Sequence, residues 1–303
     1  LNNLLNKKSI NGKYKKVYDD LPFHILQEWD DLRKMMQTSK PCKITPNRFN
    51  KAIKILAKKN NNELLNNTQH DISELYNFII DEFHKNLSRS EDIPINFNSN
   101  SKVSELVYKK IQELSKEEYS EIWDIFYGTK ILSLKKTDES NVNNNIEFFN
   151  MISLNIPKNN NPNIYDCIDL YLKPEHIENV VSNNDPNKLV SCTSKTSFWS
   201  LPKILFICFQ RIFYDNLGNI HKNNDIIDIP EKIDLSKYTI LKNKYEYELY
   251  GVCNHIGSLM GGHYTSYIKI NDKWICFNDE IVTEVNNSSI SNPFTYCAVY
   301  KNI

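Results

Sequence analysis

Four of the seven glycines in this chain lie in one short window that leads to a histidine. Gly251, Gly257, Gly261 and Gly262 precede His263, which opens an alternating, aromatic segment. Glycine permits sharp turns and close backbone approach. A loop that delivers a histidine to the start of a strand is a common mounting for a general base. The pattern predicts base catalysis by His263, and the competing interpretation is a hydrogen-bonded strand histidine without a catalytic role.

The residues after His263 predict a hairpin. Segments 263–270 and 273–277 alternate in polarity on either side of Asn271-Asp272, a pair suited to a two-residue hairpin turn. The register set by such a turn places His263 opposite Glu280.

Two polar residues near Glu280 could orient the imidazole. Side chains two residues apart share a face of the sheet, so Asn278 is expected to be a diagonal neighbour of His263. Asp279 is expected to point to the other face, although a single bulge would reverse this parity. A neutral amide can fix the tautomer and position of a histidine, as in Cys-His-Asn proteases. The spacing therefore favours Asn278.

The nucleophile that such a base would activate, a cysteine or a serine, is not evident in the chain. The cysteines are odd in number, scattered, and without the CxxC spacing of a zinc site or a disulfide framework. Cys208 and Cys276 lie in apolar strand-like runs, where a thiol behaves as a small buried hydrophobe. The pattern favours a reduced, intracellular protein. The seven are Cys42, Cys167, Cys192, Cys208, Cys253, Cys276 and Cys297.

Composition excludes several classes of protein. The chain has 303 residues, with 37 Lys and Arg balanced by 37 Asp and Glu, so no basic excess exists to bind nucleic acid. No apolar run is long enough to span a membrane, and residues 1–16 are too polar for a signal peptide. Because the first residue is Leu, we expect the sequence to be part of a longer chain.

The spacing of apolar residues predicts helices first and strands later. Thr68 and Asp71 are candidate N-caps for one of the helices. The expected helices cover 21–39, 45–60, 72–84, 101–126 and 164–173. The expected strands cover 147–156, 203–214, 246–253, 263–270, 273–277 and 295–301. The Asn tracts 143–145 and 159–161 are expected on loops. This order predicts an α+β fold with antiparallel strands.

The window around His263 closely resembles the histidine box of the ubiquitin-specific protease family. The matching segments are Tyr250 to Gly257, Gly261-Gly262-His263-Tyr264-Thr265-Ser266-Tyr267, Trp274 to Asp279, and Tyr296 to Tyr300. Three further segments, all earlier in the chain, resemble motifs of the family and occur in the family's order. They are Gln69-His70-Asp71-Ile72-Ser73-Glu74-Leu75, Ile152 to Ile156, and Leu201 to Asp215. The resemblance covers nearly the whole chain.

The resemblance implies a papain-like cysteine protease fold with a helical thumb at 1–127, fingers at 128–200 and a β palm at 201–303. It implies His263 as general base, Asn278 as the third member of the triad and Asp279 as an auxiliary acid. The expected contacts to the tail of ubiquitin come from Gln69, Asp71, Glu74, Gly261, Gly262 and Tyr264. Carboxylates suit the arginines of that tail, although Asp71 and Glu74 have an alternative role in capping the 72–84 helix.

The chain also departs from the family pattern. The family's nucleophilic cysteine opens a helix, at a position that falls upstream of Leu1, and Cys42 in its Pro41-Cys42 context is a poor substitute. The usual zinc ribbon is replaced by Ile131 to Leu134, and only Cys192 remains near its second half. We therefore expect no metal and no cofactor.

The implied activity is thiol-dependent hydrolysis of the isopeptide bond after the terminal glycine of ubiquitin. The alternatives are an inactive, ubiquitin-binding pseudo-protease and a deconjugase for a ubiquitin-like modifier. Expected partners are ubiquitin and ubiquitinated proteins, with no nucleic acid and no membrane, in the cytoplasm or nucleus. Residues 1–303 alone are expected to bind ubiquitin weakly and to turn over nothing.

Overall fold

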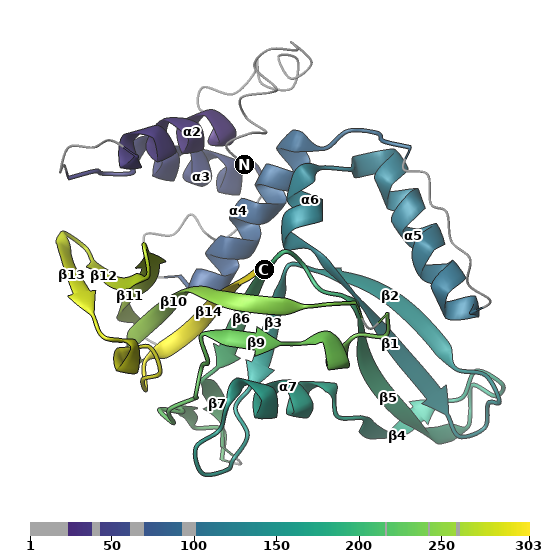
Figure 1. Ribbon diagram of the computed structural model, residues 1–303. Helices are drawn as coiled ribbons and strands as arrows, with labels where there is room; N and C mark the ends of the chain where they lie inside the picture. The colour runs from purple at the N-terminus through teal and green to yellow at the C-terminus, as the bar shows by residue number, and fades with distance from the viewer. Residues whose placement is uncertain are drawn as a thin grey trace. The chain divides into compact units, whose positions relative to one another are not determined.

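The computed structural model describes residues 24–37, 43–60, 70–92, 101–215, 217–241, 243–258 and 261–303. They form two compact units (Figure 1). The helical unit holds residues 24–37, 43–60, 70–92 and 111–124, and the sheet unit holds 101–110 and 125–303 with the gaps given above. Each is described by itself.

Three helices of the helical unit pack around aromatic side chains. They are α2 (Ile25–Met36), α3 (Asn47–Lys59) and α4 (Ile72–Leu87). The ring of Trp29 lies 5.4 Å from that of Phe49 on α3 and 5.9 Å from that of Phe83 on α4. Within α2, Ile25 and Leu32 are buried, but Met36 at the end of the helix is 63% exposed.

The single helix expected over 101–126 is in fact two, α5 (Lys102–Glu118) and α6 (Glu121–Phe126). Tyr119 leaves the helix because its backbone pairs with Arg89 through two hydrogen bonds of 2.8 Å. Ser120 then starts α6, and its Oγ accepts from the backbone N–H of Trp123 at 3.3 Å.

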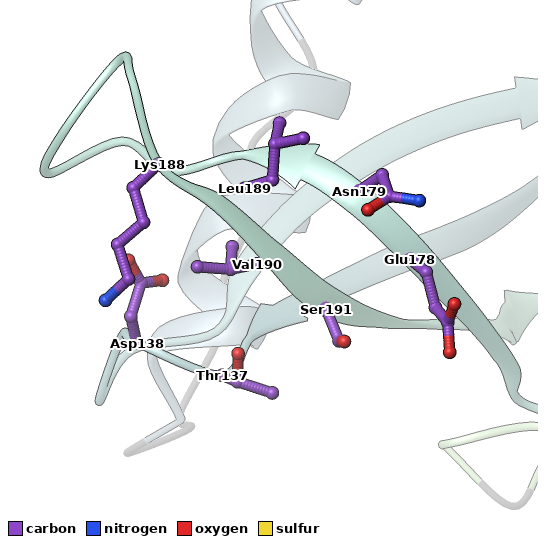
Figure 2. A pocket seen from close by; sticks show the side chains of 8 residues that line it. All are labelled: Thr137, Asp138, Glu178, Asn179, Lys188, Leu189, Val190 and Ser191. Atoms are coloured by element: carbon purple, nitrogen blue, oxygen red, sulfur yellow. The ribbon is translucent and has the colours of Figure 1, made fainter.

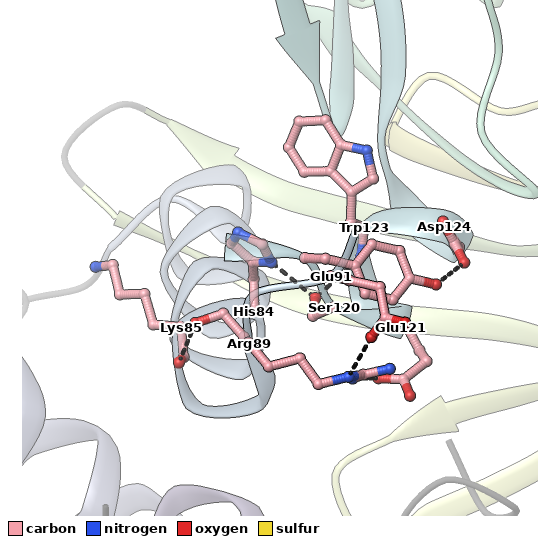
Figure 3. Close-up of polar contacts among 10 residues, drawn as sticks. His84, Lys85, Arg89, Glu91, Ser120, Glu121, Trp123 and Asp124 are labelled. Atoms are coloured by element: carbon pink, nitrogen blue, oxygen red, sulfur yellow. Dashed lines mark hydrogen bonds and ion pairs between the residues drawn. The ribbon is translucent and has the colours of Figure 1, made fainter. Parts of the chain in front are cut away.

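Ser120 also contacts a buried histidine. His84 Nδ1 lies 2.7 Å from Ser120 Oγ, and the ring of His84 lies 5.8 Å from that of Trp123 (Figure 3). His84 is 8% exposed and Ser120 is fully buried. Burial lowers the pKa of His84 from its ordinary value, which favours the neutral ring.

In the sheet unit, a four-stranded antiparallel sheet runs in the order β2 (Asn143–Phe149), β1 (Gly128–Lys136), β5 (Leu189–Ser200) and β4 (Glu175–Val181). The loop expected at Asn143 to Asn145 is wrong, because these residues pair with β1 and the side chain of Ser133 donates to Asn144 Oδ1 at 2.7 Å. The tract at 159–161 does form a bend, with Asn161 at φ 59°.

The larger sheet has eight strands. Its order is β13 (Ile281–Val285), β12 (Lys273–Asn278), β11 (Gly261–Ile270), β10 (Glu246–Ser258), β14 (Thr295–Asn302), β6 (Ile204–Gln210) and β3 (Met151–Asn155), with β9 (Lys232–Asp234) also paired to β10 (Figure 1). One expectation fails here: β3 pairs with β6 in parallel, whereas an antiparallel arrangement was predicted.

The core of the sheet unit lies against this larger sheet. Tyr247 and Tyr300 are fully buried, and their hydroxyls donate to the carbonyls of Pro202 and Pro230 at 2.6 and 2.8 Å. Helix α7 (Ile164–Leu172) adds apolar side chains to this core and begins with a capping box at Asn163. A short hairpin of β7 (Ile212–Tyr214) and β8 (Ile220–Lys222) forms a separate sheet.

Two 3-10 turns complete the sheet unit, at Ser236–Tyr238 and Asn287–Ser289. Within the described residues, no helix combines the length and the apolar character needed to cross a membrane.

Candidate active site

His263 lies near the start of β11, and its side chain is 46% exposed. Its Nε2 is 2.6 Å from Oδ1 of Asn278, the last residue of β12. The expected contact between these two side chains is therefore present. Asp279 also approaches the ring, with Oδ2 3.9 Å from Nε2.

The turn that brings them together is the one predicted from the sequence. Asn271 and Asp272 both have positive φ, 49° and 61°, as a two-residue type I′ hairpin requires. The ladder runs from Ile270 opposite Lys273 to Ser266 opposite Phe277, which confirms the expected register over that stretch.

Beyond Ser266 the structure corrects the prediction. Strand β12 ends at Asn278, which already pairs with Ile281 of β13, so Asp279 and Glu280 form the next turn. The expected pairing of His263 with Glu280 therefore does not form. Asp279 has φ 50° and is not a strand residue, so the parity argument does not apply to it. This explains why its carboxylate lies on the histidine side.

The hydrogen bond to Asn278 assigns the tautomer of His263. An amide oxygen can only accept, so Nε2 must carry the proton and donate. In the neutral ring, Nδ1 then holds the lone pair. No described residue hydrogen-bonds to Nδ1, and this nitrogen is the one available to take up a proton.

The glycines before His263 have a packing reason in the structure. A Cβ on Gly262 would lie 2.1 Å from Nε2 of His255, and one on Gly257, whose φ is 144°, would lie 2.4 Å from the Cα of Gly262. The ring of Tyr264 packs against the same His255 ring, with 4.7 Å between centroids and a tilt of 32°. Gly261 starts β11 opposite Ser258. Contacts of Gly261, Gly262 and Tyr264 with a ubiquitin tail stay predictions.

The carboxylates expected to bind the tail belong to the helical unit. Asp71 is the N-cap of α4, and its Oδ1 accepts from the backbone N–H of Ser73 at 2.7 Å and from the Ser73 hydroxyl at 2.6 Å. Glu74 lies exposed in the first turn of that helix. The capping role expected for Asp71 is confirmed. Gln69 and the other candidate cap, Thr68, lie outside the described residues.

None of the six cysteines that the structure describes lies within hydrogen-bond distance of His263. Cys208 is buried as expected, but Cys276 is only half-buried because β12 lies one strand from the sheet edge. Burial raises the pKa of the Cys167 thiol to about 12, which makes it a poor nucleophile. Cys42 lies outside the described residues.

An open pocket lies on the four-stranded sheet (Figure 2). Its volume is about 600 Å³, and it combines two carboxylates with a lysine. The lining residues are Thr137, Asp138, Glu178, Asn179, Lys188, Leu189, Val190 and Ser191. In the described part of the chain, His, Cys, Asp and Glu form no cluster of three or more that could hold a metal ion.

Comparison with solved structures identifies the class of fold. Over 85% of this chain and 53% of the solved one, the structure superposes on the SAGA Ubp8/Sgf11/Sus1/Sgf73 DUB module bound to ubiquitin aldehyde, with a TM-score of 0.64 and 21% identity. The same module bound to monoubiquitin gives a TM-score of 0.62. The fold is α+β and papain-like.

The sequence relatives identify the family. The sequence model described as ubiquitin carboxyl-terminal hydrolase matches residues 1–300, and the chain belongs to this family. Ubiquitin carboxyl-terminal hydrolase 2 of Gallus gallus is 27% identical over 91% of this chain and 80% of its own length. Ubiquitin carboxyl-terminal hydrolase 10 of Arabidopsis thaliana is 34% identical over 46% of this chain, but the match spans only 16% of that protein. A probable ubiquitin carboxyl-terminal hydrolase of Acanthamoeba polyphaga mimivirus is 30% identical over 64% of this chain and 44% of its own length.

Two residues beside His263 were not singled out from the sequence, His255 and Lys222. Lys222 donates to His255 Nδ1 although the two are 33 positions apart. No local spacing rule connects a lysine in one hairpin with a histidine in another, so only the tertiary structure reveals the pair. For His255, the motif Asn254-His255 inside the histidine box was the available signal.

Proposed function

We propose that this chain is the catalytic domain of a deubiquitinase, which hydrolyses the isopeptide bond after the C-terminal glycine of ubiquitin. Family membership and the 2.6 Å contact between His263 and Asn278 support this activity. That contact carries the proposal, because it gives an accessible imidazole a defined tautomer and orientation at the position of the family's histidine.

The proposed reaction has two halves. A cysteine thiol passes its proton to Nδ1 of His263, and the thiolate attacks the carbonyl carbon of the terminal glycine. The imidazolium then gives that proton to the leaving lysine amine, and a thioester forms. In the second half, His263 takes a proton from water, the resulting hydroxide attacks the thioester, and the thiol is regenerated.

Asn278 suits this cycle because its amide oxygen accepts from Nε2–H in both protonation states of the ring. The orientation of His263 is therefore the same before and after proton transfer. Asp279 adds a negative charge 3.9 Å from the ring, but its side chain is 79% exposed, so solvent screens most of this interaction.

The thiol in this proposal is that of a cysteine outside the described residues. Asp71, Glu74 and Gln69 are proposed to contact the arginine-bearing tail of ubiquitin, and Gly261, Gly262 and Tyr264 to line its path. We keep the division into thumb, fingers and palm at 127/128 and 200/201 as part of this proposal. We also propose that the protein acts in the cytoplasm or nucleus, on ubiquitin conjugates there.

The test uses the full protein that contains this chain and ubiquitin bearing a C-terminal fluorogenic amide. Wild-type protein is expected to release the fluorophore, and His263→Ala to abolish the release. An electrophilic ubiquitin probe should label one cysteine, and peptide mapping then identifies the nucleophile. Wild-type rates from His263→Ala would overturn the assignment.

A second candidate is a ubiquitin-binding pseudo-protease. It is favoured by one observation, that none of the described cysteines lies within hydrogen-bond distance of His263. Binding of ubiquitin without any labelling by the probe would support it. A deconjugase would be recognised by faster cleavage of a ubiquitin-like modifier than of ubiquitin in parallel assays.

A further inference from the structure

Lys222, at the end of β8, connects the small β7–β8 hairpin to the strand that precedes His263. Its ammonium donates to Nδ1 of His255 at 3.2 Å, to the backbone carbonyl of His255 at 2.8 Å and to the carbonyl of Gly257 at 2.9 Å. An ammonium group has three N–H donors, and all three are directed to His255 and Gly257, near the end of strand β10.

These contacts determine the state of His255. An ammonium can only donate, so Nδ1 of His255 must accept and the ring is the neutral Nε2–H tautomer. His255 is 7% exposed, and its ring packs at 4.7 Å on Tyr264 and at 5.7 Å on Tyr296. A buried imidazole with a fixed tautomer has little freedom to move.

His255 in turn fixes the backbone on both sides of His263. Its ring lies so close to Gly262 that a Cβ there would be 2.1 Å from Nε2. On the other side, His255 is the cross-strand partner of Tyr264. His263 itself lies opposite Ile256, the residue next to His255. A shift of the His255 ring would therefore be transmitted directly to the backbone that carries the proposed base.

Hydrogen bonds hold the base of the β7–β8 hairpin to the large sheet, and they fix the backbone of Lys222. Arg211, directly before β7, is fully buried, and its Nε donates to the carbonyl of Thr295 on β14 at 2.7 Å. Its Nη1 donates to the carbonyls of Asn223 and Asp225, at 3.1 and 2.9 Å. Asn223 follows Lys222 directly, so the lysine is tied to the large sheet through Arg211.

We propose that Lys222 is a positioning residue for the reaction: through its three hydrogen bonds to β10 it holds the His255 ring against Gly262 and Tyr264, and so sets the position of His263. This inference rests on the proposed function for its kinetic consequence only. The positioning itself is a property of the fold and can be measured without turnover.

The experiment compares Lys222→Met, which keeps the length of the side chain and removes its donors, with Lys222→Arg, which restores donors, in the full protein. With the fluorogenic ubiquitin substrate, Lys222→Met is expected to lower kcat about 10- to 100-fold at a nearly unchanged KM, because a small misplacement of a catalytic group has an effect of that size. Lys222→Arg should recover part of this loss. The matched control is Lys273→Met. Lys273 lies on β12 of the large sheet and forms an exposed ion pair with Glu284.

A second readout does not depend on activity. In nitrogen-15 spectra of the histidine rings, Lys222→Met should move the Nδ1 resonance of His255 and the resonances of His263, whereas Lys273→Met should move neither. The proposal is overturned if Lys222→Met leaves both rings unperturbed, or if it lowers kcat only in proportion to a loss of folded protein. If the wild type turns over no substrate, the deubiquitinase proposal fails, and the spectra still decide whether Lys222 positions His263.

Discussion

His263 and His84 make nearly the same contact in two different units of this molecule. Each imidazole forms a short hydrogen bond to a neutral polar side chain, 2.6 Å to Asn278 in one case and 2.7 Å to Ser120 in the other. Their surroundings differ. The His263 side chain is 46% exposed, whereas His84 is 8% exposed and packs beside Trp123 (Figure 3).

The difference shows that a histidine with a polar partner is not by itself a catalytic pair. Chemistry requires that one ring nitrogen be reachable by substrate and able to gain and lose a proton. At His263 the partner occupies Nε2, and no described residue hydrogen-bonds to Nδ1. At His84 burial disfavours the charged ring, so the same kind of bond only joins α4 to the start of α6.

The most direct test of this difference is to replace each histidine with alanine. His263→Ala should lower kcat about 1000-fold or more, since general acid–base catalysis contributes factors of up to about 10⁴. His84→Ala should leave kcat per folded molecule within about twofold, but should lower the free energy of unfolding by about 1–3 kcal/mol through loss of a buried hydrogen bond. Activity assays normalised to folded protein measure both. A large loss of kcat in folded His84→Ala protein would contradict the distinction.

The second test separates the two polar neighbours of His263. Asn278→Ala should reduce kcat about 10- to 100-fold, because the ring loses its orientation. Asp279→Ala should reduce it less than about fivefold, since exposed ion pairs contribute about 1 kcal/mol or less. Steady-state kinetics on the two variants decide the order, and a larger effect at Asp279 would make the acidic residue the orienting group.

Ser120 tests the structural member of the comparison. Ser120→Ala removes the hydrogen-bond partner of His84 and the hydroxyl oxygen that accepts from the backbone N–H of Trp123. It should lower the free energy of unfolding by about 1–3 kcal/mol. The control is Ser88→Ala, whose exposed hydroxyl donates to the carbonyl of Lys85 at the end of α4. Its cost should stay below about 0.5 kcal/mol. Denaturant unfolding of the two variants provides the measurement, and equal costs would remove the special role of the buried pair.

Acid should affect the helical unit through two histidines, the half-buried His24 and the buried His84. Burial lowers the pKa of His24 to about 4, and the pKa of His84 shifts in the same direction. The unfolded chain, with an ordinary histidine pKa of about 6.5, then binds more protons than the folded one. The contribution of the two neutral rings to stability is therefore fully present above about pH 6.5 and is lost as the pH falls toward 4. Replacing His24 and His84 with Gln should flatten this dependence in thermal unfolding between pH 4 and 7, and an unchanged slope would exclude these two rings as its cause.

The smallest expected effect concerns Asp71. Asp71→Asn keeps a good N-cap and loses only the charge, so unfolding should change by less than about 0.5 kcal/mol, whereas Asp71→Ala should cost about 1 kcal/mol. If Asp71 also binds the tail of ubiquitin, Asp71→Asn will raise KM without affecting stability. Parallel unfolding and kinetic measurements separate the two roles, and an unchanged KM would leave Asp71 as a helix cap only.

The sequence predicts the hairpin of His263 well because its signals are local. Asn271-Asp272 permits only a tight turn with positive φ, and alternation on both sides fixes the register. Parity fails at Asp279 because β12 ends at Asn278, so Asp279 and Glu280 form a turn and the predicted pairing does not reach Glu280. The break at Tyr119 and the strand at Asn143 to Asn145 both depend on distant backbone partners, Arg89 in one case and β1 in the other. Such pairing overrides local propensity and cannot be derived from composition.

The position of β14 has a consequence for how the protein folds. This strand comes after all the others in chain order, yet it lies in the middle of the large sheet, between β10 and β6. The hairpins that carry His263 and Asn278 therefore cannot join β6 and β3 until residues 295–302 have left the ribosome. Contacts that close such long loops make folding slow and leave unpaired strand edges exposed in the meantime. These strand edges are thus expected to stay unpaired until β14 is available to join the two parts of the sheet.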